Sequence, residues 1–214
     1  MTALHDLPAY ELLAAYRLRQ LSPVEVTQAV LDHIARWEPH LQATYLLRPE
    51  AALAQARASE ARWLRGTPQG LLDGVPVTVK ENIATQGDPT PLGTAATVLE
   101  PAAQDAPPAA RLREANAVFI AKTTMPDYGM LSSGLSTFHP LTRNPWDLRK
   151  NPGGSSAGGG AAAAAGYGPL HVGTDIGGSL RLPAGWCGVF SLKPSLGRIP
   201  IDPPYTGRAA GPMT

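Results

Sequence analysis

Three serines lie among the glycines of one stretch of the chain, between residues 152 and 188. Ser155 begins a serine pair that follows two glycines, and Ser179 also follows two glycines. The stretch holds 12 of the 22 glycines, so its backbone must bend sharply or approach other groups closely. Acyl-transfer chemistry needs a hydroxyl beside free backbone N–H groups that hold an oxyanion. A flexible glycine-alanine linker is disfavoured, because ordered positions such as Leu170 and Arg181 interrupt the run.

A serine nucleophile needs a base, and the usual histidine is not in place. None of the five histidines lies in a Gly-x-Ser-x-Gly elbow. His171 precedes Ser179 by eight residues, and we expect it to be an ordinary strand or loop residue. Lys80 is a different candidate, because it ends a strand in which valines alternate with other residues, as in a strand with one apolar face. A lysine desolvated at a buried strand end has a lowered pKa and accepts a proton when neutral. The alternative for Lys80 alone is a solvated strand end.

Three separated blocks resemble the amidase signature family. They read VPVTVKEN, TRNPWDLRKNPGGSSAGG and GTDIGGSLRLPAGWCGVFSLKPSLGRIP. Their order and spacing match the family, and the resemblance runs from the SPVEV motif to the final GPMT. It implies a Ser–Ser–Lys triad in which Ser179 is the nucleophile, Ser155 the bridging serine and Lys80 the base. It also implies a cis peptide bond before Ser155.

The resemblance implies further supporting groups around this triad. Asp175 and Arg181 would buttress the nucleophile loop without reacting, whereas the alternative is an exposed ion pair that contributes little to stability. Ser156 would be a supporting neighbour, and Thr174 would add a hydrogen bond to the serine network. An oxyanion-hole donor typically contributes about 3–4 kcal/mol to the transition state. The expected donors are the backbone N–H groups of Ile176, Gly177, Gly178 and Ser179.

The function that the resemblance implies is hydrolysis of a carboxylic amide to an acid and ammonia or an amine, through an acyl-enzyme on Ser179. One alternative is the glutaminase-type subunit of an aminoacyl-tRNA amidotransferase. That subunit usually has threonine where this chain has Ile176, and glutamine where it has Leu182. Another alternative is an inactive truncated fragment. We expect residues 1–214 to form a single amidase signature domain, N-terminal part only, because the family continues beyond Thr214.

The composition is compatible with a cytoplasmic enzyme that acts on a small-molecule amide. A formal net charge of +1 implies no attraction to nucleic acid or membranes, and it leaves a homo-oligomer open. We find no signal peptide, no membrane-length apolar run and no zinc-type His/Cys spacing, so we expect no metal and no cofactor. The single cysteine, Cys187, is expected to be a packed core thiol. A cysteine nucleophile is a weaker alternative, since no partnered histidine is evident.

The elements that must position these residues alternate between helices and strands. This order predicts an α/β fold, with a mixed β-sheet covered by helices. Ser22 and Glu25 form a capping box that begins a helix, which Pro39 is expected to end. Gly66 is expected to end the next helix, and Asn116 to form a left-handed cap before a strand. The other expected elements are helices at 49–64, 109–115 and 157–165, the last buried with its N-terminus at the GGSS turn, and strands at 75–79 and 117–123.

Overall fold

The computed structural model describes residues 3–200. The final segment 201–214, to which the sequence resemblance extends, lies outside the described residues. No helix within residues 3–200 is long and apolar enough to cross a membrane. The elements in chain order are η1 (Leu4–Asp6), α1 (Ala9–Arg17), α2 (Pro23–Leu41), β1 (Thr44–Leu47), α3 (Pro49–Arg65), β2 (Pro76–Lys80), α4 (Pro107–Glu114), β3 (Val118–Thr123), η2 (Asp127–Gly129), α5 (Ala157–Ala164), β4 (Leu170–Val172) and α6 (Arg181–Cys187).

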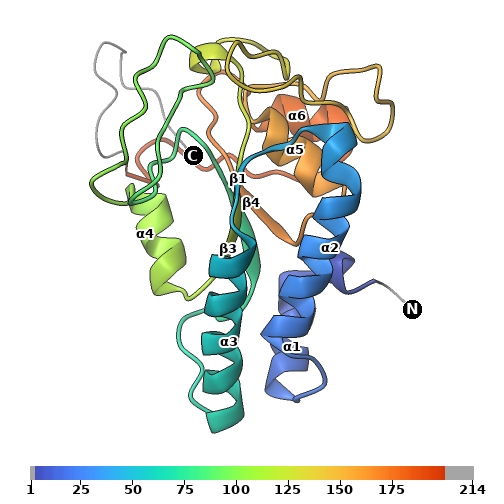
Figure 1. Cartoon of the computed structure of the whole chain (residues 1–214), viewed down its shortest axis with the longest axis vertical. Coiled ribbons are helices and arrows are strands. Elements are labelled where there is room, and N and C mark those ends of the chain that lie inside the picture. The colour runs from blue at the N-terminus through green and yellow to red at the C-terminus, as the bar shows by residue number, and fades with distance from the viewer. Residues whose placement is uncertain (1–2, 201–214) are drawn as a thin grey trace.

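The four strands form one mixed sheet with the order β1-β3-β2-β4. β2 pairs in parallel with β3 and with β4, whereas β1 pairs antiparallel with β3. Helices α2, α3 and α5 pack a core against one face, and α4 packs a smaller core against the other face (Figure 1). The predicted α/β fold, a mixed sheet covered by helices, is confirmed.

The capping box at the start of α2 forms as the sequence predicts. Ser22 Oγ accepts a hydrogen bond from Glu25 N–H, and the Glu25 carboxylate accepts one from Ser22 N–H. The expected end at Pro39 is wrong, because α2 continues to Leu41 and closes at Gln42 with a left-handed φ of 52°. Pro39 cannot donate a hydrogen bond to the carbonyl of Ala35, but only two helical residues follow it, so this loss is confined to the helix end.

Strand β2 is buried along its whole length, which differs from the single apolar face expected from its alternation. A strand inside a sheet with helices on both faces has no solvated side, so even Thr78 is buried. Lys80 at its carboxyl end is 0% exposed, and the solvated strand end considered as the alternative is therefore wrong. Lys80 therefore lies at the end of a buried interior strand of the sheet.

Candidate active site

Lys80 lies at the edge of the sheet where β2 and its parallel neighbours end. Its Nζ atom donates hydrogen bonds to Ser155 Oγ at 2.8 Å and to Thr174 Oγ1 at 2.8 Å. Thr174 follows β4 by two residues, and Ser155 precedes α5 by two residues. Because the carboxyl ends of parallel strands meet at one edge, the sheet brings together residues that are distant in sequence.

The environment of Lys80 favours its neutral form. Burial lowers the pKa of Lys80 from its ordinary 10.5 to about 7, although the Glu81 and Asp175 carboxylates act in the opposite direction. Ser155 and Thr174 beside it are also buried. A neutral amine with a free lone pair can accept a proton from a hydroxyl, which a protonated lysine cannot do.

The turn that carries Ser155 is closely enclosed by the chain after β3. The peptide bond between Gly154 and Ser155 is cis. A Cβ atom on Gly154 would lie 2.5 Å from Leu131 O, so a side chain does not fit there. On Gly129, a Cβ atom would lie 3.2 Å from Ser155 Oγ. The glycine at 129 thus lets the backbone approach the candidate bridging hydroxyl, a contact that no sequence signal indicated.

Ser156 ties the Ser155 turn to the loop that carries Ser179. Its backbone N–H donates to Ser179 O at 3.0 Å, and its hydroxyl donates to Thr174 O at 3.1 Å. A Cβ atom on Gly173 would lie 2.6 Å from Ser156 Oγ, so this contact also requires a glycine. Both loops are therefore fixed to each other through one buried serine.

Asp175 holds the loop that carries Ser179. Its carboxylate accepts backbone N–H bonds from Gly178, Leu180 and Arg181, and two further bonds at 2.9 Å from the Arg181 guanidinium. Burial alone would raise the pKa of this carboxyl, but Arg181 and the backbone donors hold it well below its usual range. The Asp175 side chain is 0% exposed and that of Arg181 is 55% exposed, so the pair is not a fully exposed ion pair.

The expected oxyanion donors are not all equivalent. Gly178 N–H donates to the Asp175 carboxylate at 2.7 Å. Among the described residues, the N–H groups of Ile176, Gly177 and Ser179 have no acceptor. Space is open around Gly177, where a Cβ atom would meet nothing within 4 Å. Three of the four expected donors are therefore available to a ligand.

The backbone of Ser179 contacts the Ser155 turn, because the Ser179 carbonyl accepts a hydrogen bond from Ser156 N–H. Within the described part of the chain, no hydrogen bond joins Ser179 Oγ to Ser155 Oγ. The structure thus brings Lys80, Ser155 and Thr174 into direct contact, with Ser179 on the adjoining loop. Catalytic hydrogen bonds of this kind often tighten only when substrate binds.

Asn82 belongs to the same network, although sequence reasoning did not single it out. Its Nδ2 atom donates to Thr174 Oγ1 at 3.2 Å, so the Thr174 hydroxyl receives bonds from both Asn82 and Lys80. The only available signal was the position of Asn82, two residues after the candidate base. Thr174 is consequently held in a single orientation towards Lys80.

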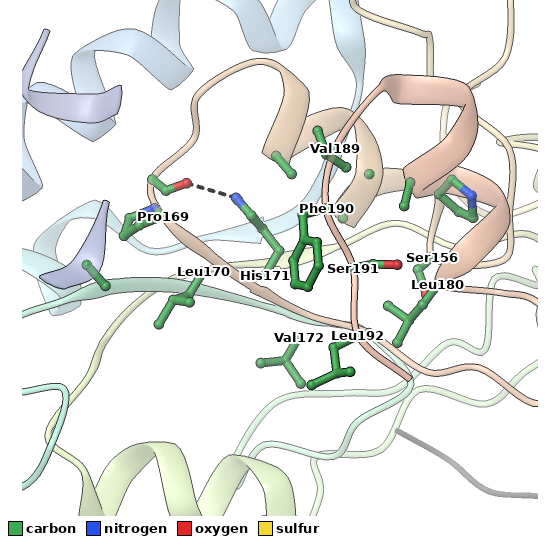
Figure 2. A pocket seen from close by; sticks show the side chains of 18 of the residues that line it. Ser156, Pro169, Leu170, His171, Val172, Leu180, Val189, Phe190, Ser191 and Leu192 are labelled. Carbon is green, nitrogen blue, oxygen red and sulfur yellow. Dashed lines mark hydrogen bonds between the residues drawn. The ribbon is translucent and has the colours of Figure 1, made fainter. Parts of the chain in front are cut away.

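His171 has both ring nitrogens occupied by structural hydrogen bonds. Thr78 Oγ1 donates to Nδ1 at 2.8 Å, and Nε2–H donates to Gly168 O at 2.9 Å, the contact drawn in Figure 2. Burial lowers the pKa of His171 to about 4, with the Gly168 carbonyl acting in the opposite direction. This neutral histidine fits the expectation of an ordinary strand residue.

A mainly apolar pocket of about 720 Å³ lies beside the loop that carries Ser179. Figure 2 shows its lining of side chains, including Val172, Leu180, Phe190 and Leu192. Lys80, Ser155 and Ser179 do not line it, whereas their chain neighbours Ser156 and Leu180 do, so it adjoins the candidate site.

Cys187 is a buried thiol that donates to Pro152 O at 3.5 Å. Burial raises the pKa of this thiol to about 11, which disfavours the thiolate and the cysteine-nucleophile alternative. Across residues 3–200, no three His, Cys, Asp or Glu side chains gather in a geometry that could hold a metal ion.

Comparisons with known proteins identify the family of this chain. The family model described as Amidase matches residues 25–213. The chain is 41% identical over 209 residues to a glutamyl-tRNA(Gln) amidotransferase subunit of Chloroflexus aurantiacus, covering 93% of this chain and 41% of that protein. It thus spans about two fifths of the length of the curated relatives it matches.

Solved structures give the same assignment. A bacterial aryl acylamidase of the amidase signature family superposes with a TM-score of 0.86 at 33% identity, over 94% of this chain and 42% of that chain. Native peptide amidase from Stenotrophomonas maltophilia superposes with a TM-score of 0.78 at 32% identity, over 84% of this chain and 38% of that chain. Together with the family match and the buried lysine–serine network, these likenesses show that the chain belongs to the amidase signature family.

Proposed function

We propose that the protein is an amidase that hydrolyses a carboxylic amide to the acid and ammonia or an amine. The observation that carries the proposal is the 2.8 Å hydrogen bond between Lys80 Nζ and Ser155 Oγ in a fully buried setting. Burial that lowers the pKa of Lys80 to about 7 supplies a neutral base near neutral pH. The substrate is a small-molecule amide, and no cofactor takes part.

In the proposed acylation, Ser179 Oγ attacks the amide carbonyl carbon. The Ser179 proton passes to Ser155 Oγ as the Ser155 proton passes to Lys80 Nζ, which becomes an ammonium. The C–N bond then breaks, and the departing nitrogen takes a proton back from Lys80 through Ser155. The product of this half-reaction is an ester on Ser179, with Lys80 neutral again.

The carbonyl oxygen gains negative charge while the tetrahedral intermediate exists. We assign its stabilisation to the N–H groups of Ile176, Gly177 and Ser179, which have no acceptor among the described residues. Asp175 keeps this loop in place by binding Gly178 N–H. Water then attacks the ester with the same base, and the acid leaves.

The test uses a longer protein that contains this segment and has the length of the curated relatives; we call it the full-length enzyme. The assay is covalent labelling of its nucleophile. A serine-directed fluorophosphonate should add one phosphonyl group to Ser179, located by peptide mass spectrometry. Ser179→Ala should abolish both labelling and amide turnover. The matched control is Ser195→Ala, which changes an exposed serine outside the network and should leave both intact. Labelling that persists in Ser179→Ala would refute the assignment.

A second candidate is the glutaminase-type subunit of an aminoacyl-tRNA amidotransferase. The curated relative named above favours it, since it carries that description. The side chains near the loop disfavour it, because Ile176 is half exposed and apolar, and Leu182 packs against Gly178. Comparing ammonia release from glutamine with that from simple aliphatic and aryl amides separates the two. Faster turnover of glutamine would favour the second candidate.

A further inference from the structure

The turn that follows β2 binds one hydroxyl with two side chains. Lys80 ends the strand, and Ile83 N–H donates to Lys80 O at 3.0 Å, which closes a turn over residues 80–83. From this turn, Lys80 Nζ and Asn82 Nδ2 both donate to Thr174 Oγ1, at 2.8 Å and 3.2 Å. Two residues of one hydrogen-bonded turn therefore hold a hydroxyl on the loop that follows β4.

The Thr174 hydroxyl sets the direction of the lysine amine. Nζ of Lys80 lies 2.8 Å from Ser155 Oγ and 2.8 Å from Thr174 Oγ1. A neutral amine has two N–H groups and one lone pair. While one N–H is bound to Thr174, the lone pair can point at the Ser155 hydroxyl, from which it must accept a proton. Without this partner the amine can rotate about its Cε–Nζ bond, and its lone pair points at Ser155 for less of the time.

The two donors to Thr174 behave differently during the reaction. In the proposed acylation, Lys80 alternates between a neutral amine and an ammonium. A hydrogen bond from a neutral donor is roughly half as strong as a charge-assisted one, so the Lys80 bond to Thr174 is weaker in the neutral state that accepts the proton. The Asn82 amide does not titrate, and its bond to Thr174 persists in both states. Asn82 therefore supports Thr174 when the lysine does so least.

We propose that Asn82 is a positioning residue for the amidase reaction: its amide N–H holds the Thr174 hydroxyl against Lys80 Nζ and so keeps the lone pair of Nζ directed at Ser155. The role rests on the proposed function, because it presumes a proton relay that ends on Lys80. Asn82 acts through Thr174, so its loss should impair the activation of Ser179 and leave substrate binding largely intact.

The first test measures how fast the fluorophosphonate labels Ser179 in the full-length enzyme, a reaction that needs an activated serine but no amide substrate. Asn82→Leu has a similar side-chain size without the N–H, and it should slow labelling about tenfold, as expected for the loss of one hydrogen bond. Amide hydrolysis should lose about the same factor in its acylation rate, with KM changed less than about twofold. Asn82→Ala carries the same expectations if the leucine variant does not fold.

A double-mutant cycle tests whether Asn82 acts through Thr174. Thr174→Val removes the hydroxyl at nearly the same size, and it should slow labelling at least as much as Asn82→Leu does. In the Thr174→Val background, Asn82→Leu should cost less than about twofold, because the contact that it breaks is already absent. A substitution that only loosened the fold would slow labelling by the same factor in both backgrounds.

Gln55→Leu is the matched control, because it also replaces a hydrogen-bonded side-chain amide by leucine. The Gln55 amide oxygen accepts Phe119 N–H at 2.9 Å near the start of β3, whereas Lys80 pairs with Thr123 at the end of that strand. The control therefore loses a structural hydrogen bond away from the hydroxyl–amine network. It should keep the wild-type labelling rate.

Two results would overturn the proposal. One is labelling at the wild-type rate in both Asn82→Leu and Asn82→Ala, and the other is an equal loss with and without the Thr174 hydroxyl. Failure of the proposed function looks different: the wild-type enzyme would be labelled on Ser179 but would hydrolyse no amide. Slower labelling in Asn82→Leu, relieved in the Thr174→Val background, would then still support the role of Asn82.

Discussion

The pH dependence of hydrolysis tests the role of Lys80 most directly. A pKa of about 7, against 10.5 for a solvated lysine, is a difference of about 3.5 pH units. At pH 7 this raises the neutral fraction from about 1 in 3,000 to about one half. We therefore expect kcat/KM to rise about tenfold per pH unit below pH 7 and to level off above about pH 8.

The assay follows ammonia or amine release from a neutral amide by the full-length enzyme, so that the substrate itself does not titrate. The Lys80→Ala variant should lose several orders of magnitude in the acylation rate without losing its fold, which circular dichroism checks. The Lys80→Arg variant should not recover it, because a guanidinium stays protonated and cannot accept the serine proton. Near-normal turnover by Lys80→Arg, or a wild-type rate that still rises tenfold per unit above pH 9, would refute the relay through Ser155.

Three further predictions concern the loop, the base and the exposed surface. Asp175→Asn should slow turnover at least about 100-fold and increase hydrogen exchange in the Ser179 loop, since a guanidinium and three backbone donors lose their charged acceptor; unchanged exchange would contradict this. Lys80→Met removes the cost of burying a lysine that holds its proton up to pH 10.5 in the unfolded chain but only up to about pH 7 in the fold. This cost is large at pH 7 and nearly absent at pH 10.5, so the substitution should raise the free energy of unfolding by about 4 kcal/mol more at pH 7 than at pH 10.5. Equal effects of that substitution at both pH values, in denaturant titrations, would refute the lowered pKa. The 214-residue polypeptide should bind a hydrophobic dye and aggregate on concentration, since Phe190 is 92% and Leu192 70% exposed. A sharp cooperative melt without dye binding would contradict it, and Phe190→Ser should reduce dye binding.

The sequence predicted elements whose ends carry local signals. The capping box at Ser22, the helix end at Gly66 and the left-handed backbone at Asn116 are found where they were expected. Caps depend on a few neighbouring residues, so they can be recognised without tertiary information. The short strands β1 and β4 have few residues to show a period, and β1 acquires its place only by pairing with β3. Helix α6 was also not predicted, because its seven residues contain Pro183 and Gly185.

The candidate triad and its supporting residues on the Ser179 loop were predicted from family motifs, whereas Asn82, Gly129 and His139 were not. Periodicity placed Lys80 at a strand end but left open whether solvent reached it. Burial depends on α5 and on the loops after β3 and β4, which meet only in the folded chain. Gly129 lies against Ser155, and His139 faces Glu81. Because the residues of each pair are far apart in sequence, these contacts could not be predicted from local patterns.

The cost of burying Lys80 explains why the site needs so many fixed neighbours. A buried amine loses its hydration, and here two hydroxyls, Ser155 and Thr174, replace water as hydrogen-bond partners. These hydroxyls must themselves be held in place. For Thr174, Asn82 Nδ2 donates to the hydroxyl and the Ser156 hydroxyl donates to the backbone carbonyl. A looser shell would admit water and return the pKa of Lys80 towards its ordinary value. The lowered pKa and the rigidity of the site are thus consequences of the same packing.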